Sequence, residues 1–399
     1  MKATQNGSRG RPDFLLLILT LLLVGFGLVM VFSASSSVAK VSFDDSLYFI
    51  KRQFIFAAMG TFIMLFMMNL RYQVYRKSFM LLFIPVIIML MIVPFSQSIN
   101  GARSWFNIGS LGLQPTELAK LALILYLGAL ISKKDEKFRD FKKGLLPVII
   151  IVGFICTLIM MQPDLGSCLV IASFAGIMIL AGGANLKHIF VAGSVLTVLA
   201  AAAVSIWMAI DPKGWQYRID RFTAYTDPLA DPLGSGWQLL SSLQALGHGG
   251  ITGTGFGESV QKLHYLKYAY NDFIFSIIGE EFGFIGSTIF LLVYLLFLWR
   301  GLIVALRCPD QYGTIVGVGI VSLFAIQAFI NIGGVTKAIP MTGVTLPFIS
   351  YGGSSLLVCL MCMGVLLSVS RESNKAENKS TNTASNRRTT TATKRTSSL

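Results

Sequence analysis

Acidic and basic residues inside long apolar segments are the first candidates for chemistry in this 399-residue chain. An ionisable side chain in apolar surroundings is costly unless it has a partner or faces a polar cavity. Glu117 and Lys120 are three residues apart, so they share one face of a helix, where they can neutralise each other or shape a cavity. Glu280 and Glu281 lie too deep in another apolar segment to be surface charges. We expect one of them to face a polar cavity or a cationic partner.

Two aspartates lie at the ends of apolar segments rather than within them. Asp164 follows Gln162 and Pro163. As an N-cap it would satisfy free backbone amides of the next helix, and direct contact with a ligand is equally compatible with its place. Asp272 ends a long polar stretch, where it either caps the following helix together with Asn271 or acts as a general base. Partial burial raises the pKa of a carboxyl group toward the range that proton abstraction needs. The residues alone leave both interpretations open.

The elements that position these residues are long apolar helices. Only 13% of the residues are charged and 54% are hydrophobic, whereas about a quarter of the residues are charged in soluble domains. Ten segments have the length and composition of membrane spans. They are Phe14–Ala34, Phe54–Leu70, Phe79–Phe95, Leu113–Ile131, Leu145–Met161, Leu165–Gly182, Ile189–Ile210, Phe273–Trp299, Thr314–Ile332 and Val344–Val369. The sequence therefore predicts an all-α polytopic membrane protein with about ten transmembrane helices.

The distribution of Lys and Arg predicts the orientation. With the N-terminus in the cytoplasm, 22 of these residues fall on the cytoplasmic side and 10 outside, as the positive-inside rule requires. Both termini are then cytoplasmic, and the net charge of +14 reflects topology rather than binding to nucleic acid. Residues 1–13 form a cytoplasmic N-terminus, 14–370 the membrane domain, and 371–399 a basic tail expected to be disordered. Residues 211–271 form a large outer loop between spans seven and eight, with a short amphipathic helix near Trp237–Leu246.

Two glycine-rich segments have no obvious helical role. His248–Gly257 is similar to a phosphate-binding loop but lacks the Gly-Lys-Ser/Thr ending of a nucleotide site. Close approach of its backbone to an anionic head group remains its candidate role. Pro340–Ser355 combines glycines, prolines and hydroxyl side chains, which predicts non-helical backbone that is buried or lines a cavity. The five cysteines follow no paired spacing and His188, His248 and His264 are scattered, so neither a disulfide framework nor a metal site is predicted.

Six motifs, spread over residues 14–370, resemble those of the shape, elongation, division and sporulation family, the FtsW/RodA peptidoglycan polymerases. The motifs are Gly101–Trp105, Gln114–Lys120, Gln162–Gly166, Gly249–Gly255 with Gln261 and Lys262, Asn271–Phe275 running to Glu281, and Leu346–Ser355. The resemblance implies a glycosyltransferase that polymerises lipid II into glycan strands at the outer face of the bacterial cytoplasmic membrane. The family's essential loop aspartate falls on Asp272, which favours the general-base interpretation. The block around Ser350 and the basic tail favour the division and sporulation branch over the elongation branch.

In this interpretation Asp272 removes a proton from the 4-hydroxyl of incoming lipid II, and a lipid pyrophosphate leaves from the growing glycan. Developing negative charge needs cations, and Arg103, Lys262 and Lys267 are the outer-face candidates. Other residues expected to bind substrate come from the same motifs and charged positions: Trp105, Glu117, Lys120, Asp164, Ser350 and Ser354. Many relatives have a proline and an acidic residue where this chain has Lys267 and Tyr268, a departure that leaves Asp272 in place.

The implied partners are lipid II, undecaprenyl-pyrophosphate-linked glycan, a class B penicillin-binding transpeptidase and other division proteins. No cofactor is required by the residues, although Mg²⁺ or Mn²⁺ is compatible with a pyrophosphate substrate. A lipid II flippase, a polymerase of the elongation branch and a non-catalytic scaffold for division proteins are the alternative functions. The flippase would use the same cavity and charges.

Overall fold

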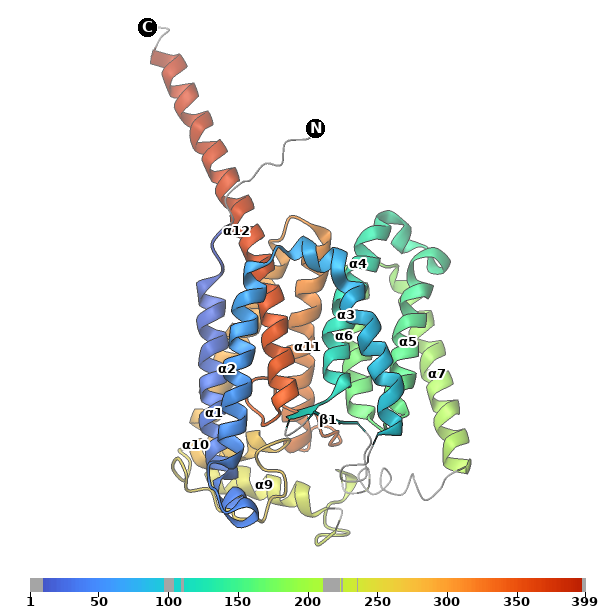
Figure 1. The fold of residues 1–399 in the computed structure, drawn as a ribbon, viewed down its shortest axis with the longest axis vertical. Helices are drawn as coiled ribbons and strands as arrows, with labels where there is room; N and C mark the ends of the chain where they lie inside the picture. The colour runs from blue at the N-terminus through green and yellow to red at the C-terminus, as the bar shows by residue number, and fades with distance from the viewer. Residues whose placement is uncertain are drawn as a thin grey trace.

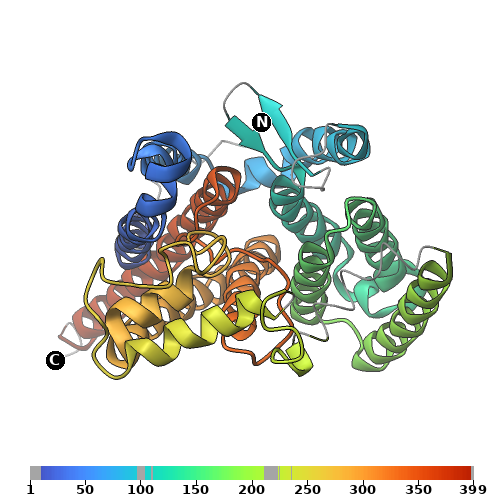
Figure 2. The same ribbon diagram turned by 90° about the horizontal axis from the view of Figure 1, so that it is seen from below.

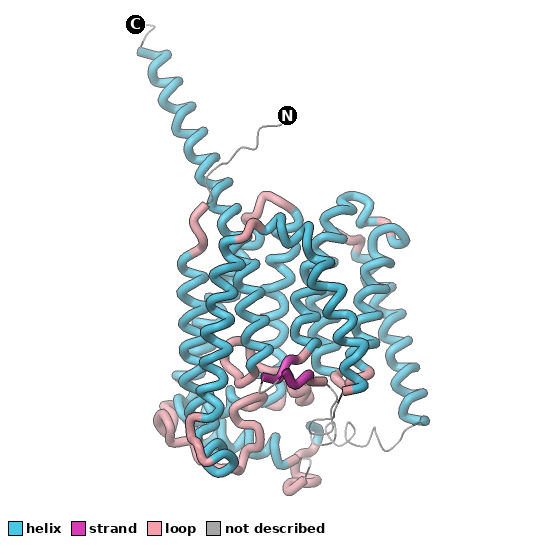
Figure 3. The backbone as a smooth tube through the Cα atoms, viewed as in Figure 1, coloured by secondary structure: helices cyan, strands magenta, loops and turns pink. Residues whose placement is uncertain are grey.

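The computed structural model describes residues 10–96, 104–108, 111–210, 223, 225–234 and 236–396. Helices make up most of this part of the chain (Figure 3). The long helices are α1 (Phe14–Phe43), α2 (Tyr48–Asn69), α3 (Tyr72–Ile92), α4 (Pro115–Lys134), α5 (Leu146–Met160), α6 (Leu165–Ala181), α7 (Leu186–Ile210), α9 (Trp237–Gly249), α10 (Ile274–Leu306), α11 (Gln311–Val335) and α12 (Gly353–Thr396). Single helical turns lie at Val93–Phe95, Asp135–Arg139 and Phe141–Leu145. A hairpin of β1 (Phe106–Ile108) and β2 (Leu111–Leu113) precedes α4.

Apart from α9, which lies across one end, the long helices form a bundle whose axes run in nearly the same direction (Figures 1 and 2). Eight helices of the described chain are long and apolar enough to cross a membrane, and the apolar segments Leu165–Ala181 and Leu186–Val195 add two shorter ones. The predicted all-α polytopic fold is therefore confirmed. Seen from one end, α7 lies at the edge of the bundle, whereas α11 lies between α10, α12 and the α4–α6 half (Figure 2).

Small residues let the central helices approach closely, as is common between membrane helices. Gly317 of α11 packs against Ala305 of α10, and Gly364 of α12 packs against Met64 of α2. Gly27 of α1 faces the backbone of Phe348, and a side chain at this position would overlap the Phe348 carbonyl. The non-helical segment 336–352 is therefore held between α1 and the rest of the bundle.

The last helix differs most from the sequence prediction. The predicted span begins at Val344, but α12 begins at Gly353 because residues 340–352 run as an irregular, partly buried chain. At its other end α12 continues to Thr396, although the sequence predicts a disordered tail after residue 371. The extension projects away from the bundle (Figure 1). A helix that is already nucleated inside a bundle adds further turns at low cost, which polarity of the tail residues alone does not reveal.

The two ends of the membrane domain lie on the same side. The Asp13 N–H donates to Ser370 Oγ at 3.0 Å, and Arg371 Nε donates to the Gly10 carbonyl at 3.0 Å. This arrangement agrees with an even number of crossings. The predicted short helix after residue 236 is present as α9, which lies against α10 and α11 at the opposite end of the bundle (Figures 1 and 2).

Candidate functional site

A cavity of about 600 Å³ lies where several helices begin or end. Its wall comes from the start of α2, the approach to α4, the α5–α6 junction, the start of α10 and the segment that leads into α12. The described lining residues are Arg52, Phe56, Ser104, Trp105, Gly112, Gln114, Glu117, Gln162, Pro163, Asp164, Asn271, Asp272, Gly343, Thr345, Tyr351, Gly352, Gly353 and Ser355. Four of the residues selected from the sequence, Trp105, Glu117, Asp164 and Asp272, thus meet in one place.

Asp272 is held by its backbone rather than by helix capping. The N-cap of α10 is Phe273, which forms no side-chain cap hydrogen bond, so the interpretation of Asp272 as an N-cap is wrong. Asn331 Nδ2 donates to the carbonyl oxygens of Asp272 and Val344, both at 2.8 Å. Asn331 therefore ties the start of α10 to the segment before α12. Gly343 has a positive φ of 75° and lies next to the Asp272 carboxylate.

Asp164 combines the two roles that the sequence left open. Its Oδ1 accepts a hydrogen bond from the Ser167 N–H at 2.9 Å, which confirms the N-cap of α6, and its side chain also lines the cavity. Next to it, Gln162 is 2% exposed and its Oε1 accepts from Thr116 Oγ1 at 3.3 Å. The α5–α6 junction is thereby tied to the first turn of α4.

Glu117 and Lys120 form the predicted ion pair, and it is buried. Lys120 Nζ lies 2.7 Å from Glu117 Oε1, and both side chains are less than a tenth exposed. Glu117 lines the cavity, whereas Lys120 lies behind it. The pair therefore places a neutralised carboxylate in the wall, and both roles expected from the sequence apply to Glu117.

Arg52 is the described cation of the cavity wall, and sequence reasoning missed it. In the sequence it appears only as an outer-side charge near the start of a span. Its guanidinium stacks over the Tyr48 ring at 4.8 Å. Burial raises the pKa of Tyr351, and Arg52, which is hydrogen-bonded to the phenol, opposes this increase. Tyr351 is therefore neutral at physiological pH and serves as a hydrogen-bonding group rather than as a base.

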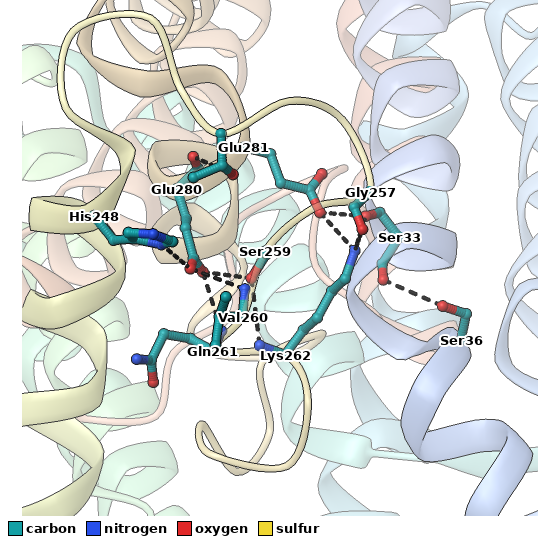
Figure 4. Close-up of polar contacts among 11 residues, drawn as sticks. Ser33, Ser36, His248, Gly257, Ser259, Val260, Gln261, Lys262, Glu280 and Glu281 are labelled. Atoms are coloured by element: carbon teal, nitrogen blue, oxygen red, sulfur yellow. Dashed lines mark hydrogen bonds and ion pairs between the residues drawn. The ribbon is translucent and has the colours of Figure 1, made fainter.

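Two other predicted cations lie away from Asp272. Lys262 Nζ bonds to Glu281 Oε1 at 2.8 Å, Ser33 Oγ at 3.0 Å and the Gly257 carbonyl at 2.7 Å, outside the cavity (Figure 4). This confirms that one carboxylate of α10 faces a cationic partner, but Lys262 is not placed beside Asp272. Lys267 is exposed, with its Nζ 5.1 Å from the centre of the Tyr268 ring, and it does not line the cavity.

The remaining predicted residues support the site or fall outside the described chain. Ser350 Oγ donates to the Asn271 carbonyl at 2.7 Å and accepts from the Leu346 N–H at 2.8 Å, so it braces the loop behind Asp272. Ser354 is buried in the first turn of α12, and its neighbour Ser355 is the serine that lines the cavity. Arg103 lies outside the described residues.

The glycine-rich segment 248–257 packs against protein backbone. Gly253 lies against Glu281 and Gly283 of α10, and the Thr254 and Gly255 N–H groups donate to the carbonyls of Glu280 and Glu281 at 3.0 and 3.1 Å. Gly283 has φ 64° and ψ −163°, which interrupts α10. The glycines thus serve an internal contact between loop and helix.

Glu280 anchors the same segment from its other side. Its carboxylate accepts from His248 Nδ1 at 2.9 Å, from the Val260 N–H at 3.0 Å, from the Gln261 N–H at 3.3 Å and from Ser259 Oγ (Figure 4). Glu280 is fully buried. The two carboxylates of α10 therefore bind one loop, and neither reaches the cavity.

The described side chains do not by themselves form a metal centre. No group of three His, Cys, Asp or Glu residues in the described ranges is close enough to hold an ion. One carboxylate of the cavity, Glu117, is already paired with Lys120. Mg²⁺ bound together with a pyrophosphate needs only one or two carboxylates, and Asp164 and Asp272 lie on the same wall.

The chain is similar to known proteins along nearly its whole length. The family model described as "Cell cycle protein", for FtsW, RodA and SpoVE, matches residues 13–375. Stage V sporulation protein E of Bacillus subtilis (strain 168) is 45% identical over 365 residues, which cover 91% of this chain and 98% of that protein. A probable peptidoglycan glycosyltransferase FtsW of Trichlorobacter lovleyi is 39% identical over 361 residues, covering 90% of this chain and 93% of that protein.

Solved structures have the same fold. A chain of a peptidoglycan synthase complex that coordinates polymerization and crosslinking matches with a TM-score of 0.72 and 29% identity, over 91% of this chain and 98% of that one. The rod shape determining protein RodA of Thermus thermophilus matches with a TM-score of 0.65 and 26% identity, over 90% of this chain and 97% of that one. The motifs, the helical bundle and these matches agree, and the chain belongs to the FtsW, RodA and SpoVE family.

Proposed function

We propose that this protein is a peptidoglycan glycosyltransferase that polymerises lipid II at the outer face of the cytoplasmic membrane. The observation that supports this most directly is the position of Asp272 on the wall of a polar cavity at the end of the bundle opposite both termini. The volume of about 600 Å³ lies within the usual range of small-molecule sites. A relative named a probable peptidoglycan glycosyltransferase is 39% identical over 90% of this chain.

The proposed reaction joins two lipid-linked sugars. Asp272 accepts the proton of the 4-hydroxyl of GlcNAc in incoming lipid II as that oxygen attacks the anomeric carbon of the terminal MurNAc of the growing glycan. The new glycosidic bond forms while the bond from that carbon to the phosphate oxygen breaks, with inversion. The lipid pyrophosphate leaves with the electron pair and needs no general acid, so a second catalytic carboxylate of the glycosidase type is not required.

Arg52 is assigned the stabilisation of the pyrophosphate. A guanidinium donates parallel hydrogen bonds to phosphate oxygens, and Arg52 lies on the cavity wall with Tyr351 holding its orientation. Arg103, expected from the sequence to do the same, is proposed as a second cation. Asp164 and Trp105 lie on the same wall and are proposed to contact the sugars.

The general-base assignment is tested by Asp272→Asn. Removal of a general base lowers the rate by about 10²- to 10⁴-fold, so purified Asp272→Asn protein is expected to form no detectable polymer from lipid II. Asp45→Asn is the control, because Asp45 lies in the loop before α2 and pairs with Lys51 at 2.7 Å, away from the cavity. Polymer formation by Asp272→Asn at the wild-type rate would reject the assignment. Translocation of lipid II into liposomes without polymer would instead identify a flippase.

The partner and the cellular process are proposed from the same relatives. A class B penicillin-binding transpeptidase would crosslink the strands, in line with the match to a chain of a complex that coordinates polymerization and crosslinking. We place the protein in division or sporulation, with both termini in the cytoplasm as the Lys and Arg distribution predicts. Protease accessibility of the C-terminal tail in inside-out and right-side-out vesicles checks the orientation.

A further inference from the structure

Two buried polar atoms on the cavity wall have no hydrogen-bond partner within the described structure. They are Nε2 of Gln162 and Oδ1 of Asn271. Both residues line the cavity that contains Asp272. Buried polar atoms are nearly always paired, and an unpaired one on a cavity wall indicates a group that pairs when ligand is bound. One of the two atoms is a donor and the other an acceptor.

Hydrogen bonds to other segments hold the Gln162 side chain and the Asn271 main chain in place. Gln162 accepts from Thr116 Oγ1 through its other amide atom, Oε1, at 3.3 Å, and the carbonyl of Gln162 accepts from Ser104 Oγ at 3.4 Å. The main chain of Asn271 is held by bonds to Tyr268 and Ser350 at 2.9 and 2.7 Å. The donor therefore comes from the α5–α6 junction and the acceptor from the residue that precedes Asp272.

The ligand group that matches a separate donor and acceptor is a secondary amide. Its carbonyl oxygen accepts one hydrogen bond and its N–H donates another, in fixed and opposite directions. A pyrophosphate only accepts and would leave Asn271 Oδ1 unpaired. A sugar hydroxyl presents one small atom, whereas the two protein atoms belong to different segments of the wall. The Trp105 ring on the same wall offers an apolar surface for a methyl group.

We propose that Gln162 and Asn271 recognise the 2-acetamido group of an amino sugar in the substrate. Gln162 Nε2 donates to the acetamido carbonyl, and Asn271 Oδ1 accepts from the acetamido N–H. This inference rests on the proposed function and adds a specificity determinant to it. Because Asn271 is adjacent to Asp272, binding of the acetamido group also sets the position of the sugar relative to the general base.

The test compares lipid II with analogues in which a hydroxyl replaces the acetamido group, in GlcNAc or in MurNAc separately. An unpaired buried group typically lowers binding by a factor of about 10 to 100. Wild-type protein is therefore expected to prefer lipid II over one of the analogues by roughly this factor in kcat/KM. Use of all three substrates with equal kcat/KM overturns the inference and leaves the proposed polymerase function intact. Failure to polymerise even lipid II overturns the proposed function instead.

Matched variants assign the preference to the two residues. Gln162→Met and Asn271→Leu keep side-chain size but remove the amides. Each is expected to bring the ratio of kcat/KM for lipid II to kcat/KM for the disfavoured analogue closer to 1. Gln114→Met is the control, because Gln114 is an amide on the same wall without an unpaired buried atom. Gln114→Met should leave the ratio of kcat/KM for lipid II to kcat/KM for the analogue unchanged, even if both values fall. An unchanged ratio in Gln162→Met and Asn271→Leu overturns their assignment, and a double variant that loses no more than each single one shows that they bind the same group.

Discussion

The acidic residues near the end of the bundle opposite the termini have different partners and therefore different roles. Glu117 is neutralised by Lys120, Asp164 caps α6, and Glu281 pairs with Lys262. Asp272 lies on the cavity wall, and its carbonyl accepts a hydrogen bond from Asn331. The degree of burial does not distinguish the roles of these carboxylates, since most of them are largely buried. The partner of each carboxylate does distinguish its role.

Lys262 provides a test of whether it acts on substrate or on the fold. Lys262→Met leaves the fully buried Glu281 without its cation, and loss of one partner of a buried pair costs about 3–5 kcal/mol in the free energy of unfolding. The double variant Lys262→Met/Glu281→Met should recover much of this loss. Thermal unfolding of the purified proteins in one detergent measures it. If Lys262→Met kept its stability but lost polymerisation, Lys262 would bind substrate, as the sequence predicts.

Single positions could be selected from the sequence only where local rules apply. The N-cap at Asp164 and the pair of Glu117 with Lys120 follow from spacing along one chain segment. Arg52, Gln162 and Asn271 gain their roles from residues far away in the sequence. Spacing carries no information on such contacts, which is why Arg52 was missed.

The interruption of α10 is the least regular feature among the long helices. Gly283 has φ 64° and ψ −163°, a conformation that is accessible essentially only to glycine. It turns the start of α10 toward the segment 250–255, whose carbonyls at Gly250 and Ile251 accept the N–H groups of Phe284 and Ile285 at 2.9 and 3.1 Å. The loop thus completes hydrogen bonds that the interruption opens.

Substitution of this glycine should destabilise the protein. We expect Gly283→Ala to lower the free energy of unfolding by about 1–3 kcal/mol through backbone strain, with additional overlap against the Gly253 N–H. Gly153→Ala in α5 is the matched control, because a Cβ at Gly153 meets nothing within 4 Å, and alanine favours a helix. Equal melting temperatures for the two variants would show that the interruption is not required.

The positions of helices could be predicted where hydropathy determines them, but not where packing against other segments determines where a helix begins or is interrupted. The apolar segments gave the spans, but the starts of α2 and α12 differ from the predicted ones. Lys51 and Arg52 read as loop residues, although the helix begins at Tyr48 and carries them. Gly283 lies in an apolar run and is indistinguishable in the sequence from a packing glycine. The interruption becomes visible only with its partner loop in place.

The two ends of the membrane domain are joined by a clasp around Asp13, formed by Asp13, Arg300 and Ser370. Asp13 is 5% exposed, and its carboxylate accepts from Arg300 Nε at 2.9 and 3.2 Å, with Nη2 at 2.7 Å. The Asp13 N–H donates to Ser370. Segments from the start, the middle and the end of the chain therefore meet at one point.

Loss of the clasp should loosen this side of the bundle. Asp13→Asn removes the charge opposite Arg300, and a hydrogen bond to a charged group contributes about 1.5–3 kcal/mol. Hydrogen exchange is expected to accelerate at the start of α1 and at residues 366–374 of α12. Asp310→Asn is the control, because Asp310 lies 3.8 Å from Arg76 at a more exposed position. Exchange rates that match the wild type would contradict a structural role of the clasp.

The arrangement of the bundle was predictable in outline because membrane spans and the charge of short loops obey simple rules. The cavity was not, because its wall combines residues from segments as distant in the sequence as Arg52 and Ser355. Most of those segments contain one of the family motifs. The motifs did not show that Asn331 joins two of these segments, since Asn331 lies in an apolar run without any motif around it.

The clasp also bears on how the protein is made. Asp13 leaves the ribosome early, but Arg300 and Ser370 follow only when most of the chain has been synthesised. Until then the Asp13 carboxylate caps α1 through the Leu16 N–H but lacks the cation that neutralises it. The contact can therefore form only after synthesis has reached the last helix.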